Sequence, residues 1–255
     1  MELRKRIIID TLEQTDSTND WLRINGEMTA DCLMRVVTAE FQTDGRGQQG
    51  NHWESEKSAN LLFSIKIAPK SVDAGGQFIL SQAIALAITD SLAPLLLENG
   101  TALSVKWPND IYWKEKKLGG ILIENRLQGR SLAESIIGAG LNVNQKSFTD
   151  YAPNPVSVKN ITGADTDRRK LLESILTKFA DYLVKIGKGD ISEIRRHYME
   201  SLFRRDGFYR YRDADGEFQA RIGSVGPDGI ITLVDEYGNS RMYEFKQVRC
   251  LFNNN

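Results

Sequence analysis

Residues 39–53 read AEFQTDGRGQQGNHW. They follow an apolar run, Leu33–Val37, which predicts a β-strand. Three glycines, one arginine and no apolar periodicity predict that residues 39–53 themselves form a loop. Glycines let backbone amides approach an anion closely, and Arg46 would stand among those amides as a fixed positive charge. The stretch therefore predicts an anion-binding loop that follows a strand.

The glycines of this loop also match the G-x-G-x-x-G pattern of dinucleotide-binding turns, at Gly45, Gly47 and Gly50. That pattern requires a helix that opens at the loop and an acidic residue about 20 positions later. Here the loop is followed by polar residues without a helical stripe, and then by a strand-like segment at 60–67. The phosphate-loop sequence Gly-Lys-Ser/Thr does not occur in the chain. The sequence therefore excludes both common nucleotide-binding motifs.

Composition places the chain among ordinary soluble proteins. With 255 residues, 41% of them apolar and 26% charged, it can bury a full core in one large or two unequal domains. A net charge of -1 gives no global reason to expect nucleic-acid binding. The only apolar run near the amino terminus, Ile7–Ile9, is too short for a signal peptide or a membrane span. We therefore expect a cytoplasmic protein without a membrane partner.

The cysteines and histidines do not form a metal-binding pattern. Cys32 and Cys250 lie far apart in the sequence, and His52 and His197 are equally isolated. The sequence therefore predicts no metal site built from protein ligands.

A first strand is expected at 7–12, followed by a helix from Ser17 or Thr18 to about Gly26. Either hydroxyl suits the N-cap position, and Asp20 favours the positive end of the helix dipole in the first turn. Capping accounts for one hydroxyl and leaves a second hydroxyl and the amide of Asn19 without a role. A purely structural cap and a ligand contact both remain open from these residues alone.

The longest apolar pattern, residues 76–98, predicts a buried helix that Pro94 ends or kinks. A strand at 102–105 and a hairpin of strands at 110–114 and 118–124 follow. Lys106 and Lys117 flank this hairpin, and each taken alone is more typical of a solvated surface. Glycines inside a strand, as at Gly119-Gly120, often mark the close approach of a ligand or another backbone.

A further strand at 135–144 carries glycines at alternate positions. Period-two geometry places Gly138, Gly140 and Asn142 on one face, as a flat floor that ends in an amide. Tight packing against the helix at 76–98 could require the same glycines, so both interpretations stay open. The anion-binding loop, the lysines and this floor together favour a site that adenylates its substrate. None of the three features favours such a site as strongly alone.

The last third of the chain predicts two helices and then a change of pattern. The helices are expected at 168–186 and 191–202. Short strands at 208–211, 218–222, 230–234 and 241–245 alternate with turns that contain glycine. This pattern predicts a small carboxyl-terminal β-barrel, with a domain boundary near residue 205.

Four motifs in order resemble the biotin protein ligases. They are GRG followed by Gly50 and Trp53, KWPND at 106–110, KLGGILIE at 117–124 and GAGLNV at 138–143. The resemblance covers nearly the whole chain. It implies an α+β fold, in which a mixed β-sheet with packed helices, like that of class II aminoacyl-tRNA synthetases, forms a catalytic domain at 1–205. An SH3-like barrel would occupy 206–255.

The resemblance also implies a function in two steps. The enzyme would join biotin to AMP, using ATP as the second substrate, and then transfer biotin to one lysine of a biotin carboxyl carrier domain. Mg²⁺ would be held mainly through phosphates, because no cluster of carboxylates is visible. Some family members carry an amino-terminal DNA-binding domain, but here the catalytic pattern begins by residue 17, so we expect no DNA partner. The resemblance allows a homodimer.

Site residues are carried over from the family by position. The biotin contacts implied are Ser17, Thr18, Asn19, Gln42, Gly45, Arg46, Gly47, Gln48, Lys117, Gly120, Gly138 and Gly140. The ATP contacts implied are Arg46, Gln48, Asn51, Trp53, Lys106, Asn109, Lys117 and Asn142. Arg46 and Lys117 are expected to stabilise the pentavalent transition state, and Asp110 to orient the carrier lysine or help remove its proton.

One position departs from the family pattern. Family loops often have a second arginine two positions after the one that matches Arg46, and here that residue is Gln48. The departure puts part of the expected phosphate contact in doubt.

Three other functions fit parts of this sequence. A lipoate ligase or related acyltransferase would keep the sheet and an acyl-lysine product. A biotin or nucleotide sensor without catalysis, or a binding module whose barrel recruits a partner, would not need a reactive site. The presence of both Arg46 and Lys117 favours catalysis over a sensor without catalysis.

Overall fold

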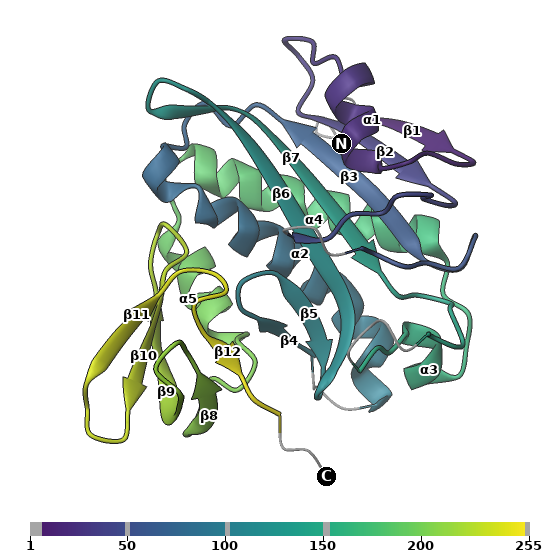
Figure 1. The fold of residues 1–255 in the computed structure, drawn as a ribbon. Helices are drawn as coiled ribbons and strands as arrows, with labels where there is room; N and C mark the ends of the chain where they lie inside the picture. Colours follow the sequence, from purple (N-terminus) through teal and green to yellow (C-terminus); the bar gives the residue numbers. More distant parts are fainter. Residues whose placement is uncertain (1–6, 49–51, 100–102, 150–153, 253–255) are drawn as a thin grey trace.

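The structure is a computed structural model that describes residues 7–48, 52–99, 103–149 and 154–252. Two β-sheets and the helices around them make up the molecule (Figure 1). The strands are β1 (Ile7–Leu12), β2 (Met34–Ala39), β3 (Leu61–Ile67), β4 (Leu103–Lys106), β5 (Asp110–Trp113), β6 (Lys116–Gln128), β7 (Ser131–Leu141), β8 (Tyr209–Arg212), β9 (Glu217–Val225), β10 (Ile231–Asp235), β11 (Ser240–Tyr243) and β12 (Arg249–Cys250). The helices are α1 (Thr18–Asn25), α2 (Phe78–Leu96), α3 (Val158–Thr162), α4 (Arg168–Gly187) and α5 (Ser192–Glu200).

The larger sheet has seven strands in the order β1-β2-β3-β7-β6-β5-β4. Strands β1 and β2 are parallel, whereas every other neighbouring pair is antiparallel. Strand β3 lies in the interior, and all seven of its residues are buried. Its near-continuous apolar sequence fits a strand covered on both faces. The mixed sheet with packed helices confirms the predicted α+β class.

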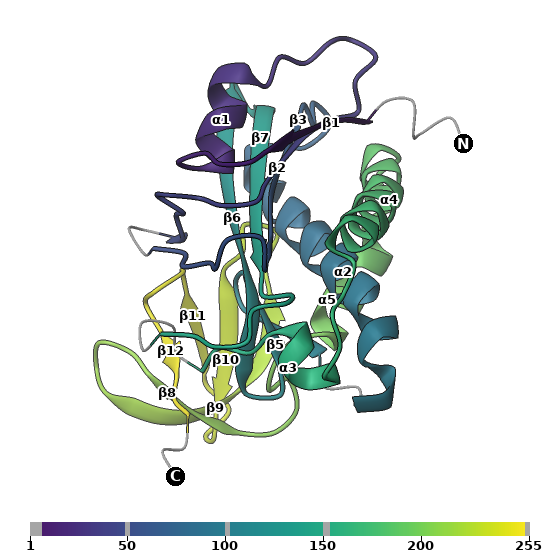
Figure 2. The ribbon, with the colours of Figure 1, turned by 90° about the vertical axis from the view of Figure 1, so that its right-hand side faces the viewer.

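Helices cover the two faces of this sheet unequally (Figure 2). Helices α2, α4 and α5 lie on one face, and α1 lies on the other, against β2, β3 and β7. Residues 74–99 are long and apolar enough to cross a membrane, but most of them are buried inside the protein. Their apolar composition is therefore explained by packing against the sheet and α4. Helix α2 continues past Pro94 to Leu96, so of the two expected effects, ending or kinking the helix, the proline does not have the first. Pro94 lies on an exposed side of the helix, where its missing N–H is not enclosed by the core.

The register of the central strands brings small residues together on the α1 face. Asp110 pairs with Gly120, Gly120 pairs with Gly140, and Gly140 pairs with Leu62. Directly opposite residues of antiparallel strands project to the same face. Asp110 therefore stands at one end of a row that continues over two residues without side chains. The glycines of this row, together with Gly138, form the floor of the site described below.

The smaller sheet has five antiparallel strands in the order β11-β10-β9-β8-β12. Its arrangement is consistent with the small barrel that the sequence predicts. Hydrogen bonds between described residues connect it to the larger part of the protein, and two of them come from Trp107 and Phe78. Trp107 Nε1 donates to the carbonyl of Gly229 at 2.9 Å, and Phe78 N donates to the carbonyl of Pro227 at 3.3 Å.

Some elements differ from the sequence predictions. Strand β6 extends to Gln128 and β7 begins at Ser131, so this hairpin is longer than expected. The short helix α3 and the short strand β12 were not predicted. A capping box between Ser157 and Asn160 begins α3. Five helical residues are too few to show the 3.6-residue period that identifies a helix.

Candidate active site

The site is a cavity of about 280 Å³ on the α1 face of the larger sheet. It is bounded by α1, the glycine loop, the floor of β6 and β7, and the start of the β5 hairpin. We use "glycine loop" for residues 42–48 together with His52 and Trp53. Its lining consists of Ser17, Thr18, Asn19, Gln42, Arg46, Gly47, Gln48, His52, Trp53, Lys106, Trp107, Pro108, Asn109, Asp110, Lys117, Gly120, Ile121, Leu122, Gly138, Ala139, Gly140 and Phe245.

The glycines of the floor are required by close neighbours on the site face. A Cβ atom on Gly138 would lie 2.4 Å from Asn19 Oδ1, and one on Gly140 would lie 2.4 Å from Trp53 Cε2. Neither neighbour belongs to α2. The structure thus favours a cleared floor over tight packing on the long helix as the reason for these two glycines. Trp53 rests directly on this floor.

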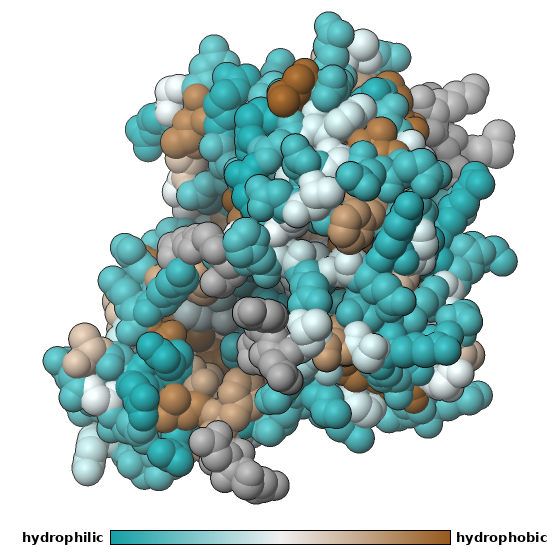
Figure 3. Space-filling model, turned by 45° about the vertical axis from the view of Figure 1, so that its right-hand side comes forward, coloured by the Kyte–Doolittle hydropathy of each residue, from teal (hydrophilic) through white to brown (hydrophobic). Residues whose placement is uncertain are grey.

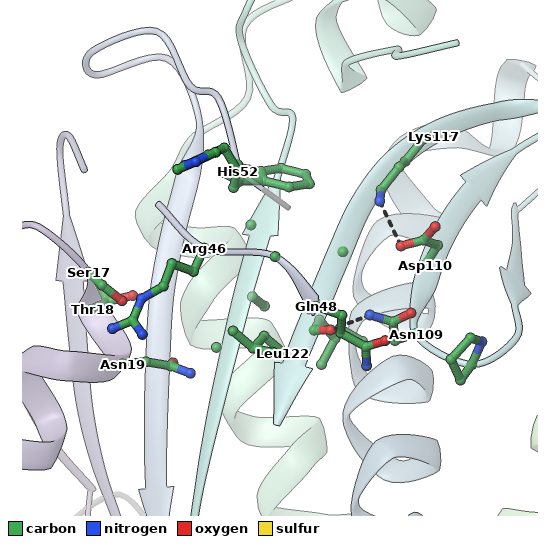
Figure 4. Close-up of a pocket in the computed structure, with 18 of the residues that line it drawn as sticks. Ser17, Thr18, Asn19, Arg46, Gln48, His52, Asn109, Asp110, Lys117 and Leu122 are labelled. Carbon is green, nitrogen blue, oxygen red and sulfur yellow. Dashed lines mark hydrogen bonds and ion pairs between the residues drawn. The ribbon is translucent and has the colours of Figure 1, made fainter. Parts of the chain in front are cut away.

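A buried hydrogen-bond network fixes the wall formed by the start of α1. Ser17 occupies the N-cap position, but its side chain makes no capping hydrogen bond. Thr18 donates from both its backbone N and its Oγ1 to Gln42 Oε1, at 2.8 and 2.9 Å. Ser64 Oγ lies 2.7 Å from Thr18 Oγ1 and 2.6 Å from Asn19 Oδ1. Figure 4 shows Ser17, Thr18 and Asn19 side by side along this wall.

Two predicted cations stand on different sides of the cavity (Figure 4). Arg46 reaches from the glycine loop toward the α1 wall, where its Nη2 contacts Asp20 Oδ2. Lys117 Nζ lies 2.8 Å from Asp110 Oδ1 and 5.8 Å from the centre of the Trp53 ring. An anion in the cavity would therefore meet one guanidinium and one ammonium, each oriented by a carboxylate.

The third cation, Lys106, lies near the carboxyl-terminal part of the protein. Burial lowers the pKa of Lys106, and the negative charge of Asp110 partly opposes that effect. Its Nζ lies 5.2 Å from the centre of the Tyr112 ring. Asn109 at the same rim donates from Nδ2 to the carbonyl of Ile121 at 2.5 Å, which fixes its side chain.

A second cavity of about 370 Å³ adjoins the first and shares Lys106, Trp107 and Phe245 with it. Residues of the smaller sheet supply much of its lining, among them Tyr211, Ile222 and Ile231. Figure 3 shows a mostly hydrophilic surface that is hollowed beside the smaller sheet, with apolar residues gathered there.

Most described residues expected in the site line the first cavity, and two of them do not. Gly45 is buried behind it, where its carbonyl accepts a hydrogen bond from Trp53 N at 2.8 Å. Asn142 is also outside the lining, and its Nδ2 donates to the carbonyl of Val156 at 3.2 Å. Asn51 lies outside the described residues.

Sequence reasoning missed several residues that build the site. Ser64 and Glu124 hold the α1 wall, because Glu124 Oε2 accepts from Asn19 Nδ2 at 2.7 Å. Asp20 was noted only for the helix dipole, and its contact with Arg46 was not expected. Ser64 gave a signal, since it is a polar residue in the middle of an apolar strand. Glu124 and Asp20 gave none, because their partners are distant in the sequence.

No group of three or more His, Cys, Asp or Glu side chains in the described part of the chain could hold a metal ion. Gln48 Oε1 and Trp53 Nε1 are buried without a hydrogen-bond partner among the described residues. The site thus combines paired cations, a glycine floor and a polar wall, which suits a substrate with a carboxylate or phosphate and a flat body.

Known proteins resemble this chain in sequence and in fold. The model of the biotin/lipoate A/B protein ligase family matches residues 11–142. A biotin--[acetyl-CoA-carboxylase] ligase of Mycobacterium tuberculosis is 31% identical over 179 residues, 69% of this chain and 64% of that protein. A protein of the same name from Paracoccus denitrificans is 27% identical over 236 residues, 89% of this chain and 90% of that protein.

The fold is also similar to that of a biotin protein ligase from Aquifex aeolicus, solved in complex with biotin and ATP. The TM-score is 0.78 at 24% sequence identity, and the match covers 96% of this chain and 98% of the other. At this level of identity the likeness establishes the fold. The chain spans less than two thirds of the length of the M. tuberculosis protein.

Proposed function

The chain belongs to the biotin/lipoate A/B protein ligase family, and we propose that it is an ATP-dependent biotin protein ligase. It forms biotinyl-5'-AMP from biotin and ATP and then transfers biotin to one lysine of a biotin carboxyl carrier domain. The observation that carries this proposal is the convergence of Arg46, the Lys117–Asp110 pair and the glycine floor on one cavity. The names of the M. tuberculosis and P. denitrificans proteins favour biotin over lipoate as the acyl substrate.

In the first step, a carboxylate oxygen of biotin attacks the α-phosphorus of ATP. The bond from that phosphorus to the bridging oxygen breaks, and pyrophosphate leaves. The transition state gathers negative charge where two anionic groups meet, so fixed cations stabilise it more than they stabilise the separate substrates. Arg46 and Lys117 supply those cations from the two sides that Figure 4 shows.

The contacts of the substrates follow from the lining of the cavity. The α1 wall, with Thr18 and Asn19, and the floor at Gly138 and Gly140 would hold biotin. Lys106 and Asn109, at the rim near the smaller sheet, would face the nucleotide. Asn142 and Gly45 would act through the backbone and loop that they support, because neither lines the cavity.

In the second step, the amine of the carrier lysine attacks the acyl carbon of biotinyl-5'-AMP. The bond from that carbon to the phosphate oxygen breaks, AMP leaves, and the amine loses a proton. A free lysine has a pKa near 10.4, so its deprotonation at pH 7 costs roughly 4 to 5 kcal/mol. Asp110, 2.8 Å from Lys117 Nζ, would orient the incoming amine or accept its proton.

Magnesium would arrive with ATP and be held mainly by phosphate oxygens. The described residues offer no cage of three or more His, Cys, Asp or Glu side chains. Among the described residues of the lining, Asp110 is the one carboxylate, and it is already paired with Lys117.

We also propose that residues 1–205 form the catalytic domain and residues 206–255 the small barrel. The described strands of the larger sheet end at Leu141, helix α5 ends at Glu200, and the smaller sheet begins at Tyr209. Lys106 and Trp107 line both cavities, and Phe245 of the carboxyl-terminal part does so too, so the barrel would complete the nucleotide side of the site.

Adenylation can be tested without a carrier. The protein is incubated with ATP, Mg²⁺ and either biotin or lipoate, and pyrophosphate release is followed. We expect release that depends on biotin. If pyrophosphate is released in the lipoate reaction and not in the biotin reaction, the protein is a lipoate ligase. If pyrophosphate is released in neither reaction, the protein is not an adenylating enzyme for these acids.

A further inference from the structure

Asp20, in the first turn of α1, contacts two arginines with its two carboxylate oxygens. Its Oδ1 contacts Nη1 of Arg23, and its Oδ2 contacts Nη2 of Arg46. Arg23 belongs to the same helix, whereas Arg46 comes from the glycine loop. The side chain of Asp20 is only 27% exposed. Asp20 therefore joins the glycine loop to the α1 wall of the cavity.

The position of Asp20 is fixed from the side opposite Arg46. Arg23 Nη2 lies 2.8 Å from Glu124 Oε1 on strand β6. The other oxygen of Glu124 accepts from Asn19 Nδ2 at 2.7 Å. Helix α1 is thus tied to the sheet by Glu124, and Asp20 is held between this anchored arginine and the loop. A carboxylate in this position can orient a guanidinium without moving with the loop.

Arg46 keeps part of its hydrogen-bonding capacity for the cavity. A guanidinium has five N–H donors in a fixed planar fork. One end of the fork faces Asp20, and Arg46 makes no second ion pair among the residues that the structure describes. Arg46 also lines the cavity. When a carboxylate holds one end of a planar guanidinium, the remaining N–H donors point in a defined direction.

We propose that Asp20 is a positioning residue for adenylation, which holds Arg46 in the orientation that meets the anionic substrates. The proposal rests on the proposed function of the site. Asp20 is not among the residues that line the cavity, so it acts through Arg46. Orientation matters because a preorganised charge stabilises a transition state without further rearrangement.

A structural role for Asp20 must be separated from this one. An acidic residue in the first turn stabilises a helix through its dipole, whatever the loop does. A purely structural residue would affect activity equally in the presence and in the absence of the Arg46 side chain. A positioning residue would lose its effect once that side chain is removed, because the two residues then act as one unit.

The test compares pyrophosphate release by Asp20→Asn, Asp20→Glu, Arg46→Ala and Asp20→Asn/Arg46→Ala. We expect Asp20→Asn to lower kcat and kcat/KM together about 10-fold, the scale of one lost charge-assisted hydrogen bond. Asp20→Glu should recover most of the loss, and Asp20→Asn should have no further effect in the Arg46→Ala background. Glu27→Gln is the matched control, because Glu27 is exposed just after α1 and lies outside the lining of the cavity, so the loss of its charge should leave activity within about 3-fold of the parent.

Hydrogen exchange of the backbone amides from Gly45 to Gln48 provides a second measurement without substrates. Exchange there should be faster in Asp20→Asn and in Arg46→Ala than in the parent. The double variant should exchange as fast as Arg46→Ala, and Glu27→Gln should exchange as the parent does. Parental behaviour of Asp20→Asn in both measurements would overturn the proposal. An equal loss of activity in both backgrounds would also overturn it. If the parent releases no pyrophosphate, the proposed function is wrong, while the exchange experiment still decides whether Asp20 orients this segment.

Discussion

Replacing Lys117 by alanine removes the ammonium group that Asp110 orients at the edge of the glycine floor. The two side chains are 23% and 19% exposed, and Nζ lies 2.8 Å from Oδ1. A cation held this closely and largely shielded from solvent is preorganised, so little rearrangement is needed when charge develops beside it. The loss of activity in Lys117→Ala should therefore appear mainly in the rate of the chemical step.

Removal of one preorganised donor costs about 10²- to 10³-fold in kcat, or about 2.7 to 4 kcal/mol. The substitution also leaves Asp110 as an uncompensated negative charge near the incoming phosphates, which acts in the same direction. We therefore expect Lys117→Ala to lower the rate of biotin-dependent pyrophosphate release at least 100-fold.

Lys116→Ala is the matched control for this substitution. Lys116 precedes Lys117 on β6, is exposed and lies outside the lining of the cavity. Its loss removes the same formal charge from the protein, so an effect of net charge would appear in both variants. Thermal unfolding of each variant would show that the fold is retained. Adenylate formation by Lys117→Ala within about 3-fold of the parent would refute the assigned role.

Three further experiments test other parts of the site and the fold. Arg46→Ala should speed the release of preformed biotinyl-5'-AMP about 10- to 150-fold, because it removes a charged contact. Gln48→Ala should speed it at most about 5-fold, because the side chain is neutral and its Oε1 has no partner among the described residues. The dissociation rates of the adenylate are measured after rapid dilution, and equal rates for the two variants would contradict this ranking. Gly140→Ala should abolish saturable binding of biotin in calorimetry, because its Cβ would lie 2.4 Å from the indole of Trp53. Gly75→Ala is the control and should bind biotin normally, because a Cβ on Gly75 meets nothing within 4 Å. Burial raises the pKa of Glu40, but hydrogen bonds from an arginine of α4 and from a serine outweigh it and hold the pKa below its usual value. The contribution of this carboxylate to stability is therefore present above about pH 4.3 and is lost as the pH falls through the lowered pKa, so urea unfolding of Glu40→Gln should depend less on pH between about 6 and 3.

Elements with a long or regular pattern could be predicted from the sequence. Strand β1, helix α1 and the buried helix α2 lie close to their expected bounds, because apolar period and turn residues agree there. The β5 and β6 pairing followed from the short lysine-rich turn between them. The bounds of β6 and β7 did not, because their polar ends, which reach Gln128 and Ser131, lack the apolar alternation that marks a strand.

The site was predictable where a residue type reports its own environment. Glycines at alternate positions of a strand indicated a floor, and the structure shows what rests on Gly138 and Gly140. Partners that are distant in the sequence left no such signal. The contact of Asp20 with Arg46 depends on how the loop crosses the sheet, which no local pattern encodes. Asn142 shows the opposite case, since its residue type suited a ligand and its amide instead holds a backbone carbonyl.

The central proposal is the transfer of biotin to a carrier lysine, and intact mass spectrometry of a biotin carboxyl carrier domain tests it most directly. The domain is incubated with this protein, biotin, ATP and Mg²⁺, beside a variant whose acceptor lysine is replaced by arginine. We predict that the carrier gains the mass of one biotinyl group only when all components and the acceptor lysine are present. An unmodified carrier, under conditions in which an established biotin ligase labels the same preparation, would contradict the proposed function.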